Sequence, residues 1–355
     1  MANPQITLTM AGGSNTAKTA FIHSMYHRLS AGVSSFSLYS VDRDKEIGLL
    51  SAWKTLQKTG QMPRAGMEPE EYHFQFTVDF TPLVQVNWTD YRGGVVTEAA
   101  TPAAQKDLIA WRQQLGRSDS VYLVMDGAEL GRWIKSGTPA ISNFASGGMD
   151  AQAYNWAIRE AKENRKAQGE PPPSFVVLIT KMDMLPENAG MPVGQALTAA
   201  VKNLGGLVRE LYAPGVTALV CPVQIGDFKT EGSSGRNVDP SLIRPQNVHR
   251  PVCFTLWHYL TEALTAQQEQ LTKIQRKITD GDTALSELQS KPFRSFRLKK
   301  IEAARADQQA QGLEKARWEA EISTTQDQAN RLMREFDRLP LIKDGKLHVA
   351  SDMSS

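Results

Sequence analysis

The residues with the clearest chemistry lie near the start of the chain, where a glycine-rich turn leads into a lysine and a threonine. The usual phosphate-binding pattern is Gly, four residues, then Gly-Lys-Ser/Thr, and here an alanine replaces the second glycine. In such a loop, backbone N–H groups surround phosphate oxygens, the lysine reaches the terminal phosphates and the hydroxyl binds Mg²⁺. The helix N-terminus that follows adds partial positive charge. The sequence therefore predicts a nucleotide phosphate site at Gly12, Gly13, Ser14, Asn15, Thr16, Ala17, Lys18 and Thr19.

A second motif supplies a carboxylate. Asp90 ends a predicted strand and begins an Asp-x-x-Gly sequence that closes at Gly93. In phosphate-loop nucleotidases, an aspartate at this place holds Mg²⁺ directly or through water, and the glycine N–H approaches the γ-phosphate. Because Asp-x-x-Gly is also common in ordinary turns, the motif gains weight only beside the phosphate loop. It predicts Thr19 and Asp90 as metal ligands.

A third motif points to guanine. Thr180, Lys181 and Asp183 directly follow a run of buried-strand residues. An aspartate there can accept the N1–H and 2-amino groups of guanine, and adenine presents no such pair of donors. The stem of Lys181 would lie along the base. Cys221 and Pro222 follow a further strand, where GTPases place a short loop that contacts the base. Together the motifs predict GTP or GDP with Mg²⁺, with an ATPase as the weaker alternative.

The elements that must position these residues follow from periodicity. Alternating or continuous apolar runs predict strands at residues 6–10, 72–80, 83–88, 121–125, 175–179 and 217–220. Segments with helical spacing lie at residues 19–29, 102–115, 150–168 and 195–212. A tight turn is predicted at Thr81 and Pro82. Strands that alternate with helices predict an α/β fold with a mostly parallel sheet, whose carboxyl edge binds the ligand. One antiparallel edge strand is expected before Asp90.

From about residue 251 the pattern changes to long helices. Leucine or isoleucine recurs every seven residues at Leu264, Leu271, Ile278 and Leu285, which predicts a coiled-coil arm. A second arm carries a 3-4 spacing with a polar middle at Gln308, Gln311 and Lys315. We predict a helical hairpin that folds back near residues 291–297; one long coiled coil that dimerises with a second chain is the alternative. The expected domains are residues 1–262, 263–340 and a loose tail at 341–355.

Composition sets the class of protein. The chain has 355 residues, 41% hydrophobic residues and a formal net charge of +2, which fits a globular protein and gives no argument for bulk nucleic-acid binding. Two cysteines do not make a disulfide framework, and with no signal peptide evident they predict a cytoplasmic protein. One basic segment with two phenylalanines, residues 291–300, is expected to touch a membrane surface, nucleic acid or a partner protein, unless it is simply a solvated turn.

Over roughly residues 1–262, the chain resembles a GTPase of the translation-factor-related class. The long insert before Asp90 and the sequence Trp88-Thr89-Asp90-Tyr91-Arg92-Gly93-Gly94 most resemble the bacterial double-GTPase group, whose members are often encoded among conflict and defence systems. The resemblance implies guanine-nucleotide binding with Mg²⁺. It also implies a switch that works through a protein partner or effector.

Several departures from that family pattern predict slow hydrolysis. Residues 63–67 lack the expected first-switch threonine, and Gly94 stands where many relatives have a water-positioning glutamine. Lys18 remains as the catalytic cation, and Arg64 and Arg92 are the in-chain candidates for stabilising transition-state charge, although each also fits an ordinary exposed arginine. A hydrolysis-deficient, nucleotide-bound scaffold for coiled-coil assembly is therefore the alternative to a working switch.

Overall fold

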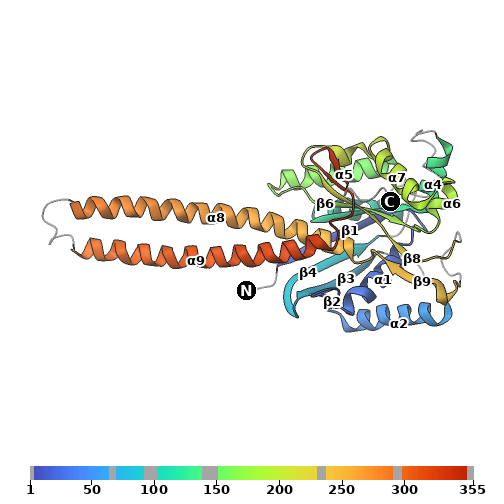
Figure 1. The fold of residues 1–355 in the computed structure, drawn as a ribbon, viewed down its shortest axis with the longest axis horizontal. Coiled ribbons are helices and arrows are strands. Elements are labelled where there is room, and N and C mark those ends of the chain that lie inside the picture. Colours follow the sequence, from blue (N-terminus) through green and yellow to red (C-terminus); the bar gives the residue numbers. More distant parts are fainter. Residues whose placement is uncertain are drawn as a thin grey trace. The chain divides into compact units, whose positions relative to one another are not determined.

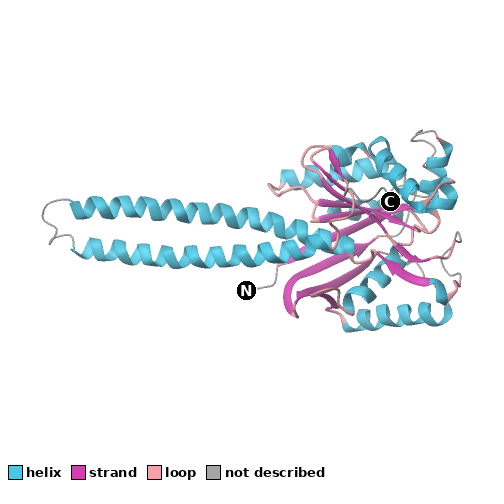
Figure 2. Ribbon diagram, viewed as in Figure 1, coloured by secondary structure: helices cyan, strands magenta, loops and turns pink. Residues whose placement is uncertain are grey.

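The computed structural model describes residues 4–63, 69–91, 102–137, 151–229, 237–290 and 298–349. The chain divides into two compact units, residues 1–255 with 336–355, and residues 256–335. Figures 1 and 2 show strands and helices layered together in the first unit and a pair of long helices in the second. The division differs from the expected boundaries at 262 and 340. Phe336 belongs to the sheet unit, where its ring packs edge-on against Phe254 at a centroid distance of 5.5 Å.

The described elements follow the expected alternation along most of the sheet unit. The strands are β1 (Gln5–Gly12), β2 (Phe36–Ser40), β3 (Glu70–Val78), β4 (Thr81–Asp90), β5 (Ser120–Asp126), β6 (Ser174–Thr180), β7 (Thr217–Pro222), β8 (Gln224–Gly226), β9 (Ile243–Gln246), β10 (Leu341–Lys343) and β11 (Lys346–His348). The helices are α1 (Lys18–Ser30), α2 (Arg43–Thr59), α3 (Pro102–Leu115), α4 (Gly127–Ser136), α5 (Ala151–Ala167), α6 (Leu185–Ala189), α7 (Val193–Leu207), α8 (Arg250–Ser290) and α9 (Leu298–Arg334), with 3-10 turns η2 (Arg209–Tyr212) and η3 (Pro240–Leu242).

Within the described residues, a nine-stranded sheet has the order β11-β10-β7-β6-β5-β1-β4-β3-β2. The five central strands, from β7 to β4, are mutually parallel, which confirms the predicted mostly parallel sheet. The register of β1 places Met10 beside Asp90. The carboxyl ends of β1, β4 and β6 therefore face the same edge, where the three predicted motifs come together.

Both faces of the central strands are covered, as their continuous apolar sequences require. On one face, alternate residues of β5 and β6, such as Leu123 and Val177, belong to a core cluster with side chains from α3 to α7. On the other face, the hydroxyl of Tyr122 hydrogen bonds with Thr255 at 3.0 Å, which attaches the first turns of α8 to the sheet. Burial of this apolar surface stabilises the unit by about 25 cal/mol per Å².

The β2–β3–β4 edge differs from the prediction. The turn between β3 and β4 lies at Asp79 and Phe80, both with positive φ (48° and 62°), whereas Thr81 and Pro82 already belong to β4. A two-residue turn with positive φ at both positions matches the right-handed twist of the two flanking strands. This is why the turn lies at Asp79 and Phe80 and not at the Thr-Pro pair. β2 and α2 were not predicted from the sequence, although the Asp42 side chain caps α2 by accepting hydrogen bonds from the N–H groups of its first turn.

The segment expected to be a loose tail contributes two strands. β10 pairs antiparallel with β7, and β11 pairs with β10 across a turn at Asp344 and Gly345. Ile342 has no exposed surface and belongs to the main core cluster. This corrects the expectation for residues 341–348, because burial of one isoleucine and the ladder to β7 offset the entropy of ordering the segment.

The second unit consists of α8 from Leu256 and of α9, joined as a helical hairpin. Of the predicted heptad residues, Leu264 is buried, whereas Leu271, Ile278 and Leu285 are only partly buried. The other buried residues of this unit include Leu256, Leu260, Ile274, Ile301, Ala329 and Leu332. The polar middle of α9 contacts α8, where Gln308 hydrogen bonds with Asp282. The predicted tip at residues 291–297 lies outside the described residues. None of the described helices has both the length and the apolar character that a membrane crossing requires.

Candidate functional site

The phosphate loop connects the carboxyl end of β1 to the start of α1. Gly12 packs so closely against β5 that a Cβ atom there would lie 2.8 Å from the Cβ of Val124. Asn15 and Ala17 have φ values of 60° and 61°, in the left-handed region. An L-residue other than glycine is strained in that region, by about 1–2 kcal/mol for alanine. The position of the second glycine in the usual pattern therefore has a glycine-type backbone that is occupied by an alanine.

Lys18 closes this loop on itself. Its ammonium group donates hydrogen bonds to the carbonyl oxygens of Gly12 (3.0 Å) and Gly13 (2.8 Å), and the Thr16 hydroxyl donates to Gly13 at 2.9 Å. Burial lowers the pKa of Lys18, and the nearby charge of Asp90 partly offsets that shift. A buried cation whose hydrogen bonds go to neutral carbonyls is well placed to bind phosphate oxygens.

Asp90 ends β4 and is 8% exposed. Burial raises its pKa to about 6, while the charge of Lys18 and a hydrogen bond from Thr19 act in the opposite direction. Within the described residues, its Oδ1 atom is buried without a hydrogen-bond partner. A buried carboxylate oxygen with no donor is a suitable ligand for a hard cation such as Mg²⁺. The residues present therefore fit the predicted metal, with Thr19 and Asp90 as the groups that would hold it.

Thr180 joins the predicted base-reading segment to the phosphate loop. Its hydroxyl lies 2.9 Å from the carbonyl oxygen of Thr16 and 3.1 Å from that of Met125, and it is 2% exposed. Next to it, Lys181 has a φ of 49°, and its ammonium group contacts Asp126 Oδ2 at 2.5 Å. These contacts tie the carboxyl ends of β5 and β6 to the phosphate loop.

Asp126 has a second role that the sequence analysis did not assign. Its Oδ1 atom accepts from the backbone N–H groups of Ala128 (2.8 Å) and Glu129 (3.4 Å), so it caps α4 while it pairs with Lys181. An aspartate directly after the buried run of β5 was the available sequence signal. The next residue, Gly127, lies close to β6: a Cβ atom on it would be 2.5 Å from the backbone carbonyl oxygen of Thr180.

Asp183, the predicted guanine reader, is partly buried and already has partners. Its Oδ2 atom accepts from the backbone N–H groups of Phe228 and Lys229, both at 3.0 Å. Burial raises the pKa of Asp183, and these amide hydrogen bonds lower it. Phe228 and Lys229 were not predicted, because a backbone donor leaves no mark in the sequence.

Cys221 and Pro222 lie at the carboxyl end of β7, where Pro222 pairs with Ile179 of β6. Both are buried within β7, where burial raises the pKa of the Cys221 thiol. The thiol lies 3.8 Å from the carbonyl oxygen of Asn247, whose side chain donates to the Pro222 carbonyl at 2.9 Å. Within the described residues, the chain that reaches Asp183 is the segment after β8. The base-contacting role of Cys221 and Pro222 stays a prediction without a contact that supports it.

Three further predicted residues, Arg64, Arg92 and Gly93, lie outside the described residues, and so does Gly94. Of the basic segment, only residues 298–300 are described, and Leu298 there is 51% exposed. In the described part of the chain, no group of three or more histidine, cysteine, aspartate or glutamate side chains forms a metal cluster. The predicted Mg²⁺ site, with two protein ligands, is of a different kind.

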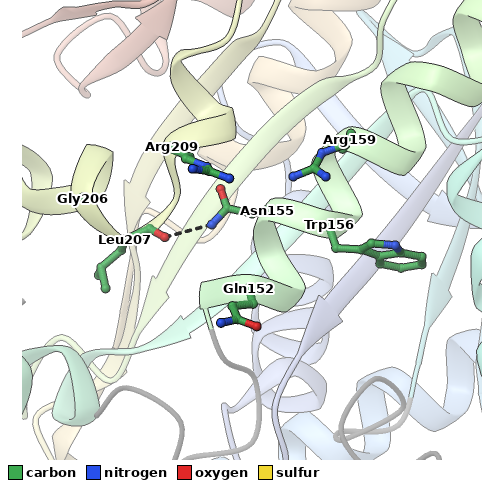
Figure 3. Close-up of a pocket in the computed structure, with 7 residues that line it drawn as sticks. All are labelled: Gln152, Asn155, Trp156, Arg159, Gly206, Leu207 and Arg209. Atoms are coloured by element: carbon green, nitrogen blue, oxygen red, sulfur yellow. Dashed lines mark hydrogen bonds between the residues drawn. The ribbon is translucent and has the colours of Figure 1, made fainter. Parts of the chain in front are cut away.

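A groove of 430 Å³ lies between α5, the end of α7 and η2 (Figure 3). Its lining residues are Gln152, Asn155, Trp156, Arg159, Gly206, Leu207 and Arg209. Asn155 donates to the Leu207 carbonyl at 3.0 Å and accepts from the Glu210 N–H at 3.0 Å, and Arg159 contacts Glu210 at 3.2 Å. These bonds hold the helices together. None of the lining residues belongs to the predicted nucleotide site, which leaves the phosphate loop as the stronger candidate.

Comparison with known proteins places the chain in no family. No family model and no curated protein matches it. Solved structures with partial likeness include Era in complex with MgGDPNP and a segment of 16S ribosomal RNA (12% identity, 63% of this chain and 52% of that chain, TM-score 0.32). A variant of Aquifex aeolicus Era bound to GDP.AlF4⁻ gives 11% identity, 74% and 68% coverage and a TM-score of 0.34. A variant of SsGBP has 13% identity and a TM-score of 0.28, and the match covers 62% of this chain and 49% of that chain.

The chain therefore spans about half the length of the first of these structures. At TM-scores of this size, the likeness carries no argument about function. What the site can do rests on the geometry of the chain itself.

Proposed function

We propose that this chain is a guanine-nucleotide-binding switch that requires Mg²⁺ and hydrolyses GTP slowly on its own. The observation that carries the proposal is the bond between the Thr180 hydroxyl and the Thr16 carbonyl. It places the segment that contains Asp183 one hydrogen bond away from the phosphate loop. A nucleotide has its base and its phosphates joined by one sugar, so a site for it needs both segments side by side.

Most of the predicted residues then have a role in binding. The N–H groups of residues 12–19 and the Lys18 ammonium group bind the phosphates, and to do so Lys18 gives up its bonds to Gly12 and Gly13. Mg²⁺, when bound to Thr19 and Asp90, neutralises charge on the phosphate oxygens. Gly93 approaches the γ-phosphate, and Thr180, Lys181 and Asp183 hold the base.

Slow hydrolysis follows from what the sequence does not provide. Gly94 cannot orient a water molecule, and residues 63–67 contain no threonine to bind Mg²⁺ in the triphosphate state. We propose Arg64 or Arg92, or an arginine from a partner, as the charge that completes the site; an arginine supplied in trans raises such rates by roughly 10³–10⁵.

The output of the switch is proposed to pass through the helical hairpin and a protein partner. γ-Phosphate and Mg²⁺ order the switch segments, hydrolysis releases them, and a partner or the coiled-coil arm reads the difference. The basic segment 291–300 is a candidate contact for that partner, for nucleic acid or for a membrane. Both cysteines are buried and free, which suits the reducing cytoplasm, and the double-GTPase resemblance suggests a bacterial conflict or defence system.

A scaffold that binds GTP without cleaving it is the second candidate. The strained left-handed conformation of Ala17 favours it, because an efficient phosphate loop would have glycine there. Both candidates bind nucleotide, so binding does not separate them. Phosphate release with the purified chain, measured with and without candidate partners, does: sustained release supports the switch, and none under any condition supports the scaffold.

The binding step is tested by calorimetry with GTP, GDP and ATP in the presence of Mg²⁺. We expect micromolar or tighter binding of the guanine nucleotides, lost in Lys18→Ala and weakened in Asp183→Ala. Lys58→Ala, an exposed lysine on α2, is the matched control and should bind like the unaltered chain. Equal affinity for ATP and GTP would overturn the guanine assignment.

A further inference from the structure

Two neighbouring backbone N–H groups converge on one oxygen of Asp183. The amides of Phe228 and Lys229 each lie 3.0 Å from Oδ2. A carboxylate oxygen accepts about two hydrogen bonds, one for each lone pair. Oδ2 is therefore filled by these two backbone donors.

The pair of amides resembles the edge of the ligand that the site is proposed to bind. Guanine also presents two adjacent N–H donors, from N1 and the 2-amino group, and a carboxylate receives such a pair best with one donor on each oxygen. While both amides stay in place, Asp183 offers no lone pair on Oδ2 for this pairing. Backbone and base then require the same acceptor.

The segment that supplies the amides is also held by contacts other than its hydrogen bonds to Asp183. The Phe228 ring lies against Gly226, so closely that a Cβ atom on the glycine would be 2.4 Å from it. The Asp227 N–H donates to the Leu242 carbonyl at 3.2 Å, which links the segment to the end of η3. Lys229 has a φ of 49°, a conformation that is strained for lysine. Moving the segment breaks bonds but also releases strain.

We propose that residues 227–229 act as a built-in competitor for the guanine base at Asp183. This inference rests on the proposed guanine-nucleotide function. Binding of the base displaces at least one of the two amides from Oδ2. The segment then takes a different position in the guanine-bound chain, and the affinity for guanine is lower than the carboxylate alone would give. ATP does not use Asp183, so its binding is indifferent to the segment.

Removing one amide tests the competition. Phe228 is not among the residues with a positive φ, so Phe228→Pro deletes an N–H donor without placing proline in the left-handed region. Phe228→Leu is the matched control, because it keeps the N–H and an apolar side chain against Gly226. We expect Phe228→Pro to bind GDP about tenfold more tightly than Phe228→Leu, the effect of one hydrogen bond to a charged group. Equal or weaker binding would mean that the amides position the carboxylate, and would overturn the proposal.

Hydrogen exchange on the unaltered chain tests the displacement independently, and it remains usable if Phe228→Pro does not fold. Saturation with GDP should speed the exchange of the Phe228 and Lys229 amides, whereas an ordinary ligand contact slows it. Unchanged or slower exchange contradicts displacement. In an Asp183→Ala background, the proline and leucine variants should bind GDP equally. If the unaltered chain and Phe228→Leu bind no guanine nucleotide at all, the proposed function fails, and that result is distinct from bound nucleotide with unchanged amides.

Discussion

The bond from Thr180 to the phosphate loop can be tested by replacing Thr180 with valine. Valine has the same shape as threonine, so the substitution removes the hydroxyl and leaves no cavity. In the structure this hydroxyl lies within hydrogen-bond distance of the carbonyl oxygens of Thr16 (2.9 Å) and Met125 (3.1 Å), and Thr180 is 2% exposed. A single hydroxyl proton donates to one of them at a time, so the substitution removes one hydrogen bond and takes this donor away from a buried carbonyl oxygen.

The magnitude follows from that count. A typical hydrogen bond contributes about 0.5–1.5 kcal/mol net, and an unsatisfied buried partner costs about 1–3 kcal/mol. We therefore expect Thr180→Val to lower the free energy of unfolding of the sheet unit by about 1–2 kcal/mol. A phosphate loop without this bond has more freedom to lose on binding, and fixing one residue costs about 1–2 kcal/mol, so GDP affinity should fall roughly tenfold.

Urea unfolding, followed by tryptophan fluorescence, measures the stability, and calorimetry with GDP measures the affinity. Thr180→Ser is the matched control, because it keeps the hydroxyl and loses only a methyl group. The serine variant should retain affinity within about twofold, a difference of less than 0.5 kcal/mol. If valine lowers stability but leaves affinity unchanged, Thr180 is only a core residue. If serine impairs binding as much as valine does, the hydroxyl is not the cause, and the reasoning about the bond is refuted.

Four other outcomes are expected. Ala17→Gly removes about 1–2 kcal/mol of backbone strain but adds about 0.4–1 kcal/mol of unfolded-state entropy. The free energy of unfolding in urea should therefore stay equal or rise by up to about 1.6 kcal/mol, and a loss would contradict the left-handed assignment. Arg165→Met removes the partner of Asp119 at 2.9 Å and should cost about 2–3 kcal/mol by the same measurement, below the value for a fully buried pair because Asp119 is 28% exposed. Burial lowers the pKa of His23, so the folded chain favours the neutral ring. The stability from this neutral ring is present above about pH 6.5 and is lost as pH falls through the lowered pKa. The melting temperature should therefore fall less steeply from pH 7 to pH 5 in His23→Gln than in the unaltered chain. Ile342→Asp places a charge in the core and should lower the melting temperature of the sheet unit, whereas a loose tail would tolerate it.

The sequence predicted the centre of the fold well, because its strands combine long apolar runs with flanking helices. The run before Thr180 is buried along its whole length, and continuous burial leaves a signal that local composition carries. The phosphate loop was also predictable, since its chemistry depends on consecutive residues. The helix α2 was missed although Leu49, Trp53 and Leu56 recur at helical spacing and are buried. The helix was missed because the polar residues around these three make the segment polar on average.

Contacts between distant segments account for most of what was missed. Asp344 and Gly345 carry a recognisable hairpin signal, but nothing local says that the preceding strand pairs with β7. The backbone donors to Asp183 come from residues 45 and 46 positions further along the chain and involve no side chain. Any residue except proline provides such a donor, so no pattern of residue types could have indicated it.

Two of the groups proposed to bind the nucleotide have hydrogen-bond partners within the chain itself. Lys18 donates to two loop carbonyls, and Asp183 accepts two backbone amides. A ligand must therefore exchange these bonds rather than form new ones, and exchanged bonds contribute little net free energy. Oδ1 of Asp90 differs, because it is buried and has no donor within the described residues. A cation at Asp90 would gain an interaction that nothing inside the chain now supplies. Most of the free energy of binding should then come from the metal and the phosphates, while Asp183 mainly decides which base is accepted.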